Sequence, residues 1–271
     1  MRTVVHLSDL HFGRVDQTLL SPLIAAVTQA RPDLIVVSGD LTQRAKSREF
    51  EQARQFLDRL PAPQVVVPGN HDVPLWNVFS RFARPLARFR LHITGDLMPT
   101  YFDDELAVLG INTARSMVIK NGRINEDQLD EVRRRLCHLD ANVTKIIVTH
   151  HPFDLPATHD NDNLVGRATL AMRTFAQCGA DLLLAGHFHT SHAGNTADRY
   201  RILDHSALVV QAGTATSTRG RGEANSFNVI RIEHPRIAVE RREWRADAAQ
   251  FVVAGTERFE TMDGHWRQAV A

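Results

Sequence analysis

The chain has 271 residues, of which 43% are hydrophobic and 23% charged. This balance is ordinary for a globular protein and excludes intrinsically disordered and fibrous classes. The formal net charge of +1 creates no strong overall field that would attract a polyanion, so any phosphate binding must be local.

We expect one domain over residues 1–271, with residues 246–271 as a C-terminal extension of unassigned role. Cys137 and Cys178 make no disulfide framework, and we expect both thiols to be reduced. No apolar run approaches the roughly 18 residues of a membrane span, and the first run is too short and too polar for a signal peptide. These features predict a cytoplasmic protein. They do not indicate the oligomeric state, and a dimer is one of the open alternatives.

Short apolar runs typical of buried strands alternate with helical patterns along the first 190 residues. The runs cover residues 3–7, 34–37, 65–67, 106–111, 146–148 and 182–185, and the helical patterns cover 19–30, 46–60, 125–139 and 169–178. Such alternation predicts a mainly parallel sheet covered by helices.

The pattern changes after about residue 195. Residues 208–212, 227–233 and 237–244 look like strands with no helix between them, and Pro235 marks a turn. We therefore expect an antiparallel edge or a second sheet. Residues 246–271 have mixed polarity, and a terminal helix, a lid and a contact surface are all open for them.

Five of the apolar runs end in short motifs with metal-ligand side chains. In chain order they are Asp9-Leu10-His11, Gly39-Asp40, Gly69-Asn70-His71-Asp72, His150-His151-Pro152 and Gly186-His187-Phe188-His189. In open α/β sheets, ligands bind beyond the carboxyl ends of the strands, so these motifs can converge. Their carboxylate, carboxamide and imidazole groups suit Mn, Fe or Zn, and seven such side chains are too many for one ion. The motifs predict a two-metal active site.

Each motif alone is weak, because an Asp after a strand is more often a helix cap than a ligand. Five in this order resemble the metallo-dependent, or calcineurin-like, phosphoesterases, whose pattern is D-x-H, G-D, G-N-H-D/E, H and G-H-x-H. The resemblance covers roughly residues 3–190. The first three motifs are most similar to the bacterial branch of class III cyclic nucleotide phosphodiesterases and glycerophosphodiesterases. Residues 39–45 read GDLTQRA, which disfavours the protein serine/threonine phosphatases and their G-D-x-x-D-R-G run.

The resemblance implies a four-layer α/β/β/α sandwich with central mixed sheets and a binuclear metal site at the carboxyl ends of the strands. It also implies two ligand sets, one of Asp9, His11, Asp40 and His189 and the other of Asp40, Asn70, His150 and His187. Asp40 would then bridge the two ions. Ions about 3.5–4 Å apart generate hydroxide near neutral pH and clamp an in-line phosphoryl displacement, and a bridging hydroxide is the expected nucleophile.

His71 and Asp72 are the expected catalytic residues. His71 would lie beside the phosphate without a metal and donate a hydrogen bond to the leaving oxygen, and Asp72 would orient it. The alternative is that His71 merely supports Asn70.

His151, Asn112 and Arg115 are weaker candidates for contact with substrate. The ligand of the fourth motif should be His150, because the superfamily separates ligand and proline by one residue, so His151 packs or touches substrate. Arg115 follows a strand-like run and would bind a phosphate oxygen or form a surface salt bridge.

Trp76, Phe79 and Phe82 follow the third motif at helical spacing. They would stack on a nucleobase or, the interpretation we favour, pack in the core. The densest basic run, Arg133 to Arg135, points in different directions on a helix and offers no one-sided contact with nucleic acid.

The sequence thus favours a metal-dependent phosphodiesterase that hydrolyses a small diester, either a cyclic nucleotide or a glycerophosphodiester. We do not expect nucleic acid as a partner. The alternatives are a nuclease or phosphomonoesterase of the same fold, and a non-catalytic interaction scaffold.

Overall fold

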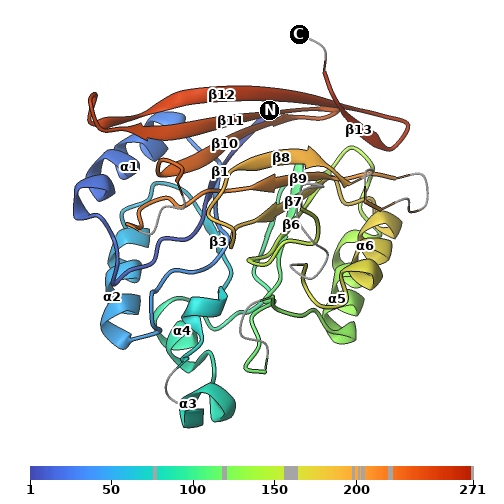
Figure 1. Cartoon of the computed structure of the whole chain (residues 1–271). Coiled ribbons are helices and arrows are strands. Elements are labelled where there is room, and N and C mark those ends of the chain that lie inside the picture. The colour runs from blue at the N-terminus through green and yellow to red at the C-terminus, as the bar shows by residue number, and fades with distance from the viewer. Residues whose placement is uncertain are drawn as a thin grey trace.

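The computed structural model describes residues 1–75, 78–117, 121–155, 164–196, 199–200, 202, 205–218 and 222–269, so Trp76 lies outside the described residues. Two β-sheets stack face to face, and helices cover both outer faces (Figure 1). The arrangement confirms the predicted α/β/β/α sandwich.

The first sheet has seven strands in the order β13-β12-β11-β10-β1-β2-β3. The bounds are β1 Arg2–Leu7, β2 Leu34–Val37, β3 Gln64–Val66, β10 Ser226–Glu233, β11 Arg236–Arg245, β12 Gln250–Met262 and β13 His265–Gln268. Strands β1, β2 and β3 are parallel, and every pairing from β1 through β10 to β13 is antiparallel. The sheet is therefore mixed, with the predicted antiparallel region at one side.

The second sheet has six strands in the order β4-β5-β6-β7-β9-β8. The bounds are β4 Thr100–Phe102, β5 Leu106–Gly110, β6 Thr144–Val148, β7 Leu182–Ala185, β8 His192–Asn195 and β9 Leu208–Gln211. Its four central strands are parallel, and the edge strands β4 and β8 are antiparallel to their neighbours.

Helices α1 and α2 cover the outer face of the first sheet, and α5 and α6 cover the outer face of the second (Figure 1). The bounds are α1 Gln17–Ala30, α2 Ser47–Leu57, α3 Val78–Ala83, α4 Ala87–His92, α5 Glu126–Leu136 and α6 Ala168–Gln177, with a short 3-10 helix η1 at Asn70–Asp72. The sequence fixes where α5 begins: the Asn125 side chain caps the helix by accepting a hydrogen bond from the Gln128 N–H.

Three apolar layers result from the alternation of side chains along the strands. In β1, Val5 and Leu7 pack with Leu23 of α1, whereas Val4 faces the second sheet and packs with Ile146 and other inner residues. The strand ends that carry the five motifs are held between these layers.

The C-terminal residues complete the first sheet as β12 and β13, so the terminal-helix alternative for residues 246–271 is wrong. The fully buried Trp266 packs between the sheets, and its Nε1 donates a hydrogen bond to Asp181 Oδ1 over 3.3 Å. This segment therefore seals one end of the core between the sheets.

Cys137 and Cys178 form a disulfide bond, so the expectation of reduced thiols is wrong. Cys137 directly follows α5 and Cys178 directly follows α6. The two helices lie side by side on one sheet and end together, which brings cysteines 41 residues apart in sequence into contact (Figure 1). The sequence around each cysteine does not indicate that the two helices pack together.

Phe79 and Phe82 do not pack in the core, contrary to our expectation. Their side chains are 83% and 54% exposed on the short helix α3. None of the described helices is both long enough and apolar enough to cross a membrane.

Candidate metal centre

The motifs meet at the carboxyl ends of β1, β2, β3, β6 and β7 because parallel strands end at the same edge. Backbone hydrogen bonds join the loops: the Asp9 N–H donates to the Gly39 carbonyl, and the His11 N–H donates to the Asp40 carbonyl. Five predicted ligands have left-handed backbones, a strained conformation for residues other than glycine. Their φ angles are 53° for Asp9, 51° for His11, 52° for Asp40, 78° for His187 and 61° for His189.

Glycines in the motifs allow this close approach. A Cβ atom at Gly69 would lie 2.1 Å from Asp40 Oδ1, and one at Gly186 would lie 1.9 Å from Ser8 Oγ. Any side chain at these positions would push the loops apart, so the glycines set the distance between the loops that carry the ligands.

Asp9, His11 and His189 form a first group of ligand atoms. Asp9 Oδ1 lies 3.2 Å from His189 Nε2 and 3.5 Å from His11 Nε2, and the two imidazole nitrogens are 3.3 Å apart. The other carboxylate oxygen, Oδ2, accepts hydrogen bonds from Ser8 Oγ at 2.6 Å and from the His187 N–H at 3.1 Å. These two donors fix the carboxylate so that Oδ1 faces the histidines.

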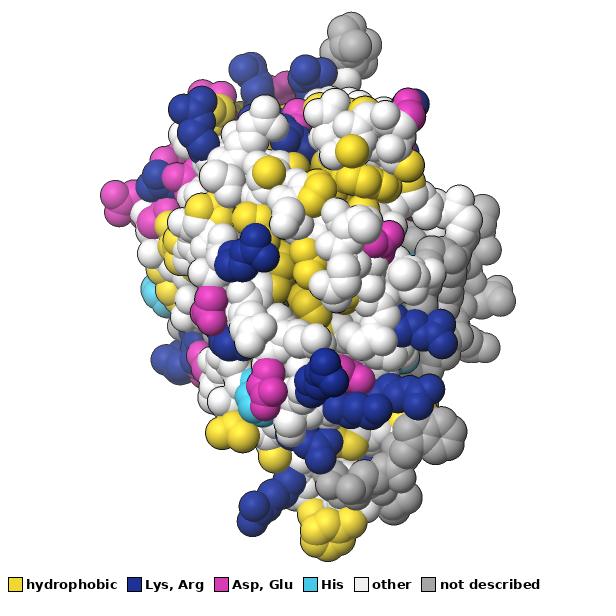
Figure 2. Space-filling model, turned by 90° about the vertical axis from the view of Figure 1, so that its left-hand side faces the viewer, with side chains coloured by type: hydrophobic (Ala, Val, Ile, Leu, Met, Phe, Trp, Pro, Cys, Tyr) yellow, Lys and Arg dark blue, Asp and Glu magenta, His cyan; other side chains and the backbone are white. Residues whose placement is uncertain are grey.

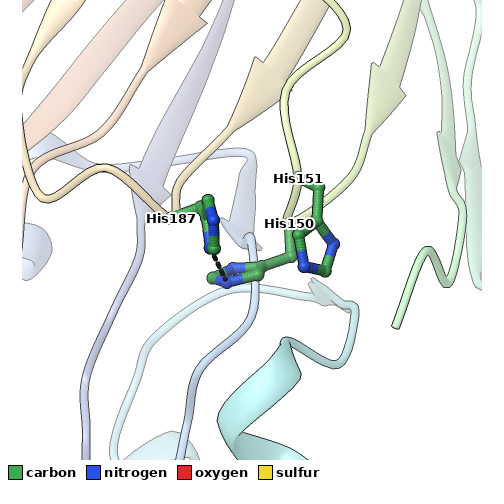
Figure 3. Close-up of side chains that lie close together, drawn as sticks. All are labelled: His150, His151 and His187. Atoms are coloured by element: carbon green, nitrogen blue, oxygen red, sulfur yellow. Dashed lines mark hydrogen bonds between the residues drawn. The ribbon is translucent and has the colours of Figure 1, made fainter. Parts of the chain in front are cut away.

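Asn70, His150 and His187 form a second group. Asn70 Oδ1 lies 3.1 Å from both His150 Nε2 and His187 Nδ1, and these two nitrogens are 3.3 Å apart. Figure 3 shows the His187 and His150 rings almost perpendicular to each other, with a nitrogen of one facing a nitrogen of the other, and His151 beside His150.

Asp40 lies between the two groups. Its Oδ1 is 3.4 Å from His150 Nε2 and accepts a hydrogen bond from the His71 N–H at 2.9 Å, while its Oδ2 is 3.8 Å from His11 Nε2. The structure therefore brings all seven predicted ligands together, with one carboxylate facing both sides.

The donor set fits cations. His150 Nδ1 donates to the Ser38 carbonyl over 2.8 Å, so in the neutral ring the lone pair on Nε2 faces the oxygens of Asn70 and Asp40. Acceptors that face one another repel unless a positive charge lies between them. In the first group, the fully buried Asp9 Oδ1 receives no well-aligned hydrogen bond from any of the described residues, and its near neighbours are the imidazole nitrogens of His189 and His11. Each group thus presents buried lone pairs that a metal ion would satisfy.

The pKa shifts of His150 and Asp40 also indicate a site that favours positive charge. Burial lowers the pKa of His150, but the Asp40 carboxylate outweighs this effect and raises the pKa to about 9. Burial raises the pKa of Asp40, yet the surrounding histidines, His150 above all, hold it well below its usual range. This pocket of negative potential attracts positive charge, whether proton or metal.

His71 directly follows Asn70 and projects toward His11; the centroids of the two imidazole rings are 5.0 Å apart. His71 Nδ1 lies 3.0 Å from the Gln43 carbonyl oxygen. Asp72 accepts hydrogen bonds from the backbone N–H groups of Leu41, Thr42 and Gly69 and from Thr42 Oγ1. Asp72 therefore positions His71 through the backbone that it anchors, and the Gln43 carbonyl orients the ring.

Burial and the nearby Asp40 charge raise the pKa of Asp72 to about 6, against the hydrogen bonds that it accepts. The hydrogen bonds that Asp72 accepts stabilise its charged form and so offset part of the cost of burying that charge.

The three weaker candidates lie at different depths. His151 is buried beside the second group, 4.8 Å from His187 between ring centroids, and its Nδ1 lies 2.8 Å from Thr113 Oγ1. Asn112 accepts a hydrogen bond from the Ala114 N–H, and Arg115 donates to the Asn112 carbonyl. Both are thus engaged in a turn, and none of their described contacts is with the seven ligands.

Two residues that position the ligands were missed from the sequence. Ser8 orients the Asp9 carboxylate, and Ser38 presents the carbonyl that orients His150. Their places directly before Asp9 and Gly39 were the available signal, but a serine beside a ligand has many other uses.

Comparison with known proteins gives the family. The family model of calcineurin-like phosphoesterases matches residues 2–191. A probable cyclic nucleotide phosphodiesterase of Synechococcus is 28% identical over 55% of this chain and 58% of its own length, and one of Rhodococcus erythropolis is 27% identical over 84% and 79%. For several curated relatives the chain spans little more than half their length.

The fold is also shared with solved structures. A dimetal phosphatase from Danio rerio has a TM-score of 0.64 at 16% identity, over 89% of this chain and 96% of that one. Since the family model spans well over half of the chain, the chain belongs to the calcineurin-like phosphoesterase family.

Proposed function

We propose that the chain is a binuclear metal-dependent phosphodiesterase. The observation that carries this proposal is the position of Asp40, whose two oxygens face two separate groups of ligand atoms. A carboxylate shared by two sites is the arrangement that a pair of ions a few Å apart requires.

Asp9, His11 and His189 would hold one ion, Asn70, His150 and His187 the other, and Asp40 both. When bound, two ions supply charge neutralisation at a phosphate and a water of lowered pKa. Oxygen and imidazole ligands without thiolate suit Mn, Fe or Zn. His71, oriented by the Gln43 carbonyl, would donate a hydrogen bond to the leaving oxygen, which needs a proton as the ester bond breaks.

The proposed substrate is a small diester, a cyclic nucleotide or a glycerophosphodiester. Relatives named as phosphodiesterases of both kinds support this class. His151, close to His187, is a candidate for substrate contact, whereas the contacts of Asn112 and Arg115 favour a structural role. The cytoplasmic location stays a proposal from the sequence, and the Cys137–Cys178 disulfide counts against it, because disulfides are rare in reducing compartments.

Metal analysis followed by an assay panel tests the proposal. The metal-loaded protein should hydrolyse bis(p-nitrophenyl) phosphate faster than p-nitrophenyl phosphate, and cyclic nucleotides and glycerophosphodiesters should then identify the substrate. Asp40→Asn should lose activity by at least about a hundredfold, because the shared carboxylate supports both sites. Asp58→Asn, on the exposed end of α2, is the matched control and should keep full activity.

Three outcomes would contradict the proposal. Metal-loaded protein without hydrolysis of any diester would indicate a scaffold. Faster turnover of the monoester would indicate a phosphomonoesterase. Cleavage of single-stranded DNA, with an affinity that falls as salt rises, would indicate a nuclease.

A further inference from the structure

One end of the molecule exposes large hydrophobic side chains beside helices α3 and α4. We call it the α3–α4 tip and define it as residues 74–75, 78–92 and 112–117. Phe79, Met117, Phe82 and Leu75 are exposed by 83%, 81%, 54% and 45%. Exposed side chains of this size and number at one place mark an interaction site.

These side chains belong to one surface because Arg81 ties their backbones together. Its Nε donates to the Ser116 carbonyl at 2.8 Å, and its Nη1 donates to the Pro74 carbonyl at 3.3 Å. Leu75, Phe82 and Met117 directly follow Pro74, Arg81 and Ser116 in sequence. The buried guanidinium thus fixes three exposed apolar residues around one point.

The α3–α4 tip is strongly cationic, although the chain as a whole is nearly neutral. Residues 73–95 contain four arginines and no Asp or Glu. Among the described residues, neither Arg84, Arg88 and Arg90 nor the neighbouring Arg115 forms an ion pair with a carboxylate, whereas Arg54, Arg231 and Arg242 do so elsewhere. Figure 2 shows Lys/Arg and hydrophobic side chains together at the bottom of the face in view.

A pocket of about 430 Å³ opens within this cationic region. Arg84, Arg90 and Arg115 line it together with apolar residues that include Leu86 and Leu97. Burial, and secondarily the charge of Arg123, lower the pKa of Arg115. The pocket suits an anion joined to an apolar group.

We propose that the α3–α4 tip binds the surface of a bilayer that contains anionic phospholipids. Phe79, Phe82 and Met117 enter the boundary between headgroups and acyl chains, and Arg84 and Arg90 of the pocket bind a lipid phosphate. Single-stranded nucleic acid fits less well, because Leu75 and Met117 cannot stack on bases. Their transfer from water into lipid, in contrast, lowers the free energy of the system. This inference does not depend on the proposed activity.

Vesicle sedimentation with the full chain tests the inference. The protein should sediment with phosphatidylcholine vesicles that contain phosphatidylglycerol and not with pure phosphatidylcholine, and the bound fraction should fall as NaCl is raised. Absence of binding to the anionic vesicles would overturn the proposal.

Two double variants separate the contributions. Arg84→Gln with Arg90→Gln should weaken binding by roughly thirtyfold, and Phe79→Ser with Phe82→Ser by at least about tenfold. The control, Val253→Ser with Met262→Ser, changes exposed hydrophobic residues on β12 and should bind as the unchanged protein does. Thermal unfolding should be the same for all variants, since the substituted side chains are exposed.

Two further outcomes would overturn the proposal. Equal loss of binding in the β12 control would show that exposed apolar area acts anywhere on the surface. Binding of single-stranded DNA that the tip variants abolish, without binding to vesicles, would assign the α3–α4 tip to nucleic acid instead.

Discussion

His150 Nδ1 lies 2.8 Å from the carbonyl oxygen of Ser38, and this contact decides which ring nitrogen faces the candidate metal centre. A carbonyl oxygen only accepts, so Nδ1 carries the proton and Nε2 is left as the candidate ligand atom. Nε2 then lies 3.1 Å from Asn70 Oδ1 and 3.4 Å from Asp40 Oδ1. A backbone group of one motif loop thereby orients the ligand of another.

The two ligand groups should be separable by mutation. His189→Ala and His187→Ala should each lower the metal content by about one ion per chain, and Asp40→Ala should lower the occupancy of both sites, because it faces both groups. Elemental analysis of purified protein gives the measurement, with His205→Ala, whose ring bonds to the Ala180 carbonyl, as the control. Loss of both ions from either single histidine variant would show that the sites are not independent.

His71→Ala should keep both metal ions and lower turnover by about a hundredfold to ten-thousandfold, the usual contribution of a positioned acid. The ring lies beside the cluster without being one of the seven ligands. Steady-state kinetics together with metal analysis test this, and the exposed His138→Ala serves as the matched control. Unchanged turnover would leave His71 as a mere support for Asn70.

Replacing both cysteines, Cys137→Ser with Cys178→Ser, should lower the free energy of unfolding by about 2–4 kcal/mol, because the bond closes a long loop in the unfolded chain. Urea unfolding with and without reductant measures the effect. The unchanged protein in reductant should match the double variant. Two titratable thiols in the untreated protein would contradict the bond.

Trp266→Ala should lower the free energy of unfolding by about 3–5 kcal/mol, the range for removing a large buried aromatic side chain. The loss would also leave Asp181 Oδ1 without its indole donor. Val253→Ala, at a largely exposed position of β12, should change stability by less than about 0.5 kcal/mol. Equal stability of the two variants would mean that β13 does not seal the core.

We expect the protein to become less stable as the pH falls below about 6.5, in part because of His6. Burial lowers the pKa of this side chain to about 3. Between these values the unfolded chain binds a proton that the folded protein excludes, so the free energy of unfolding decreases as the pH falls. One such group contributes a slope of at most about 1.4 kcal/mol per pH unit. In urea unfolding at a series of pH values, His6→Gln should have a correspondingly smaller slope, and identical slopes would refute the assignment.

Much of the fold and of the site could be predicted because the signals are local. Apolar runs of strand length predicted β1, β2, β6 and β7 to within two residues, and the motifs that follow them contain all seven side chains that converge. The strand period and the rule for carboxyl ends need no knowledge of distant residues. The roles of these side chains stay predictions until metal and activity are measured.

The errors came from contacts between distant segments. Phe79 and Phe82 have the spacing of a core-facing helix, but α3 stands away from the sheets and exposes them. Cys137 and Cys178 each end an ordinary helix, and only the side-by-side packing of α5 and α6 joins them. Residues 250–268 alternate too weakly to be read as strands, and they form β12 and β13 because β11 offers an edge with which they pair.

Local pattern was enough to indicate the kind of chemistry, because the order of the five motifs and their places after apolar runs can be read without knowing which segments meet. The tertiary structure decided how the ligands are oriented and which surfaces remain exposed. The Ser38 carbonyl, the two faces of Asp40 and the cationic α3–α4 tip result from loops that meet across two sheets. Hydrogen-bond direction and burial are properties of such meetings, and no single stretch of sequence contains them.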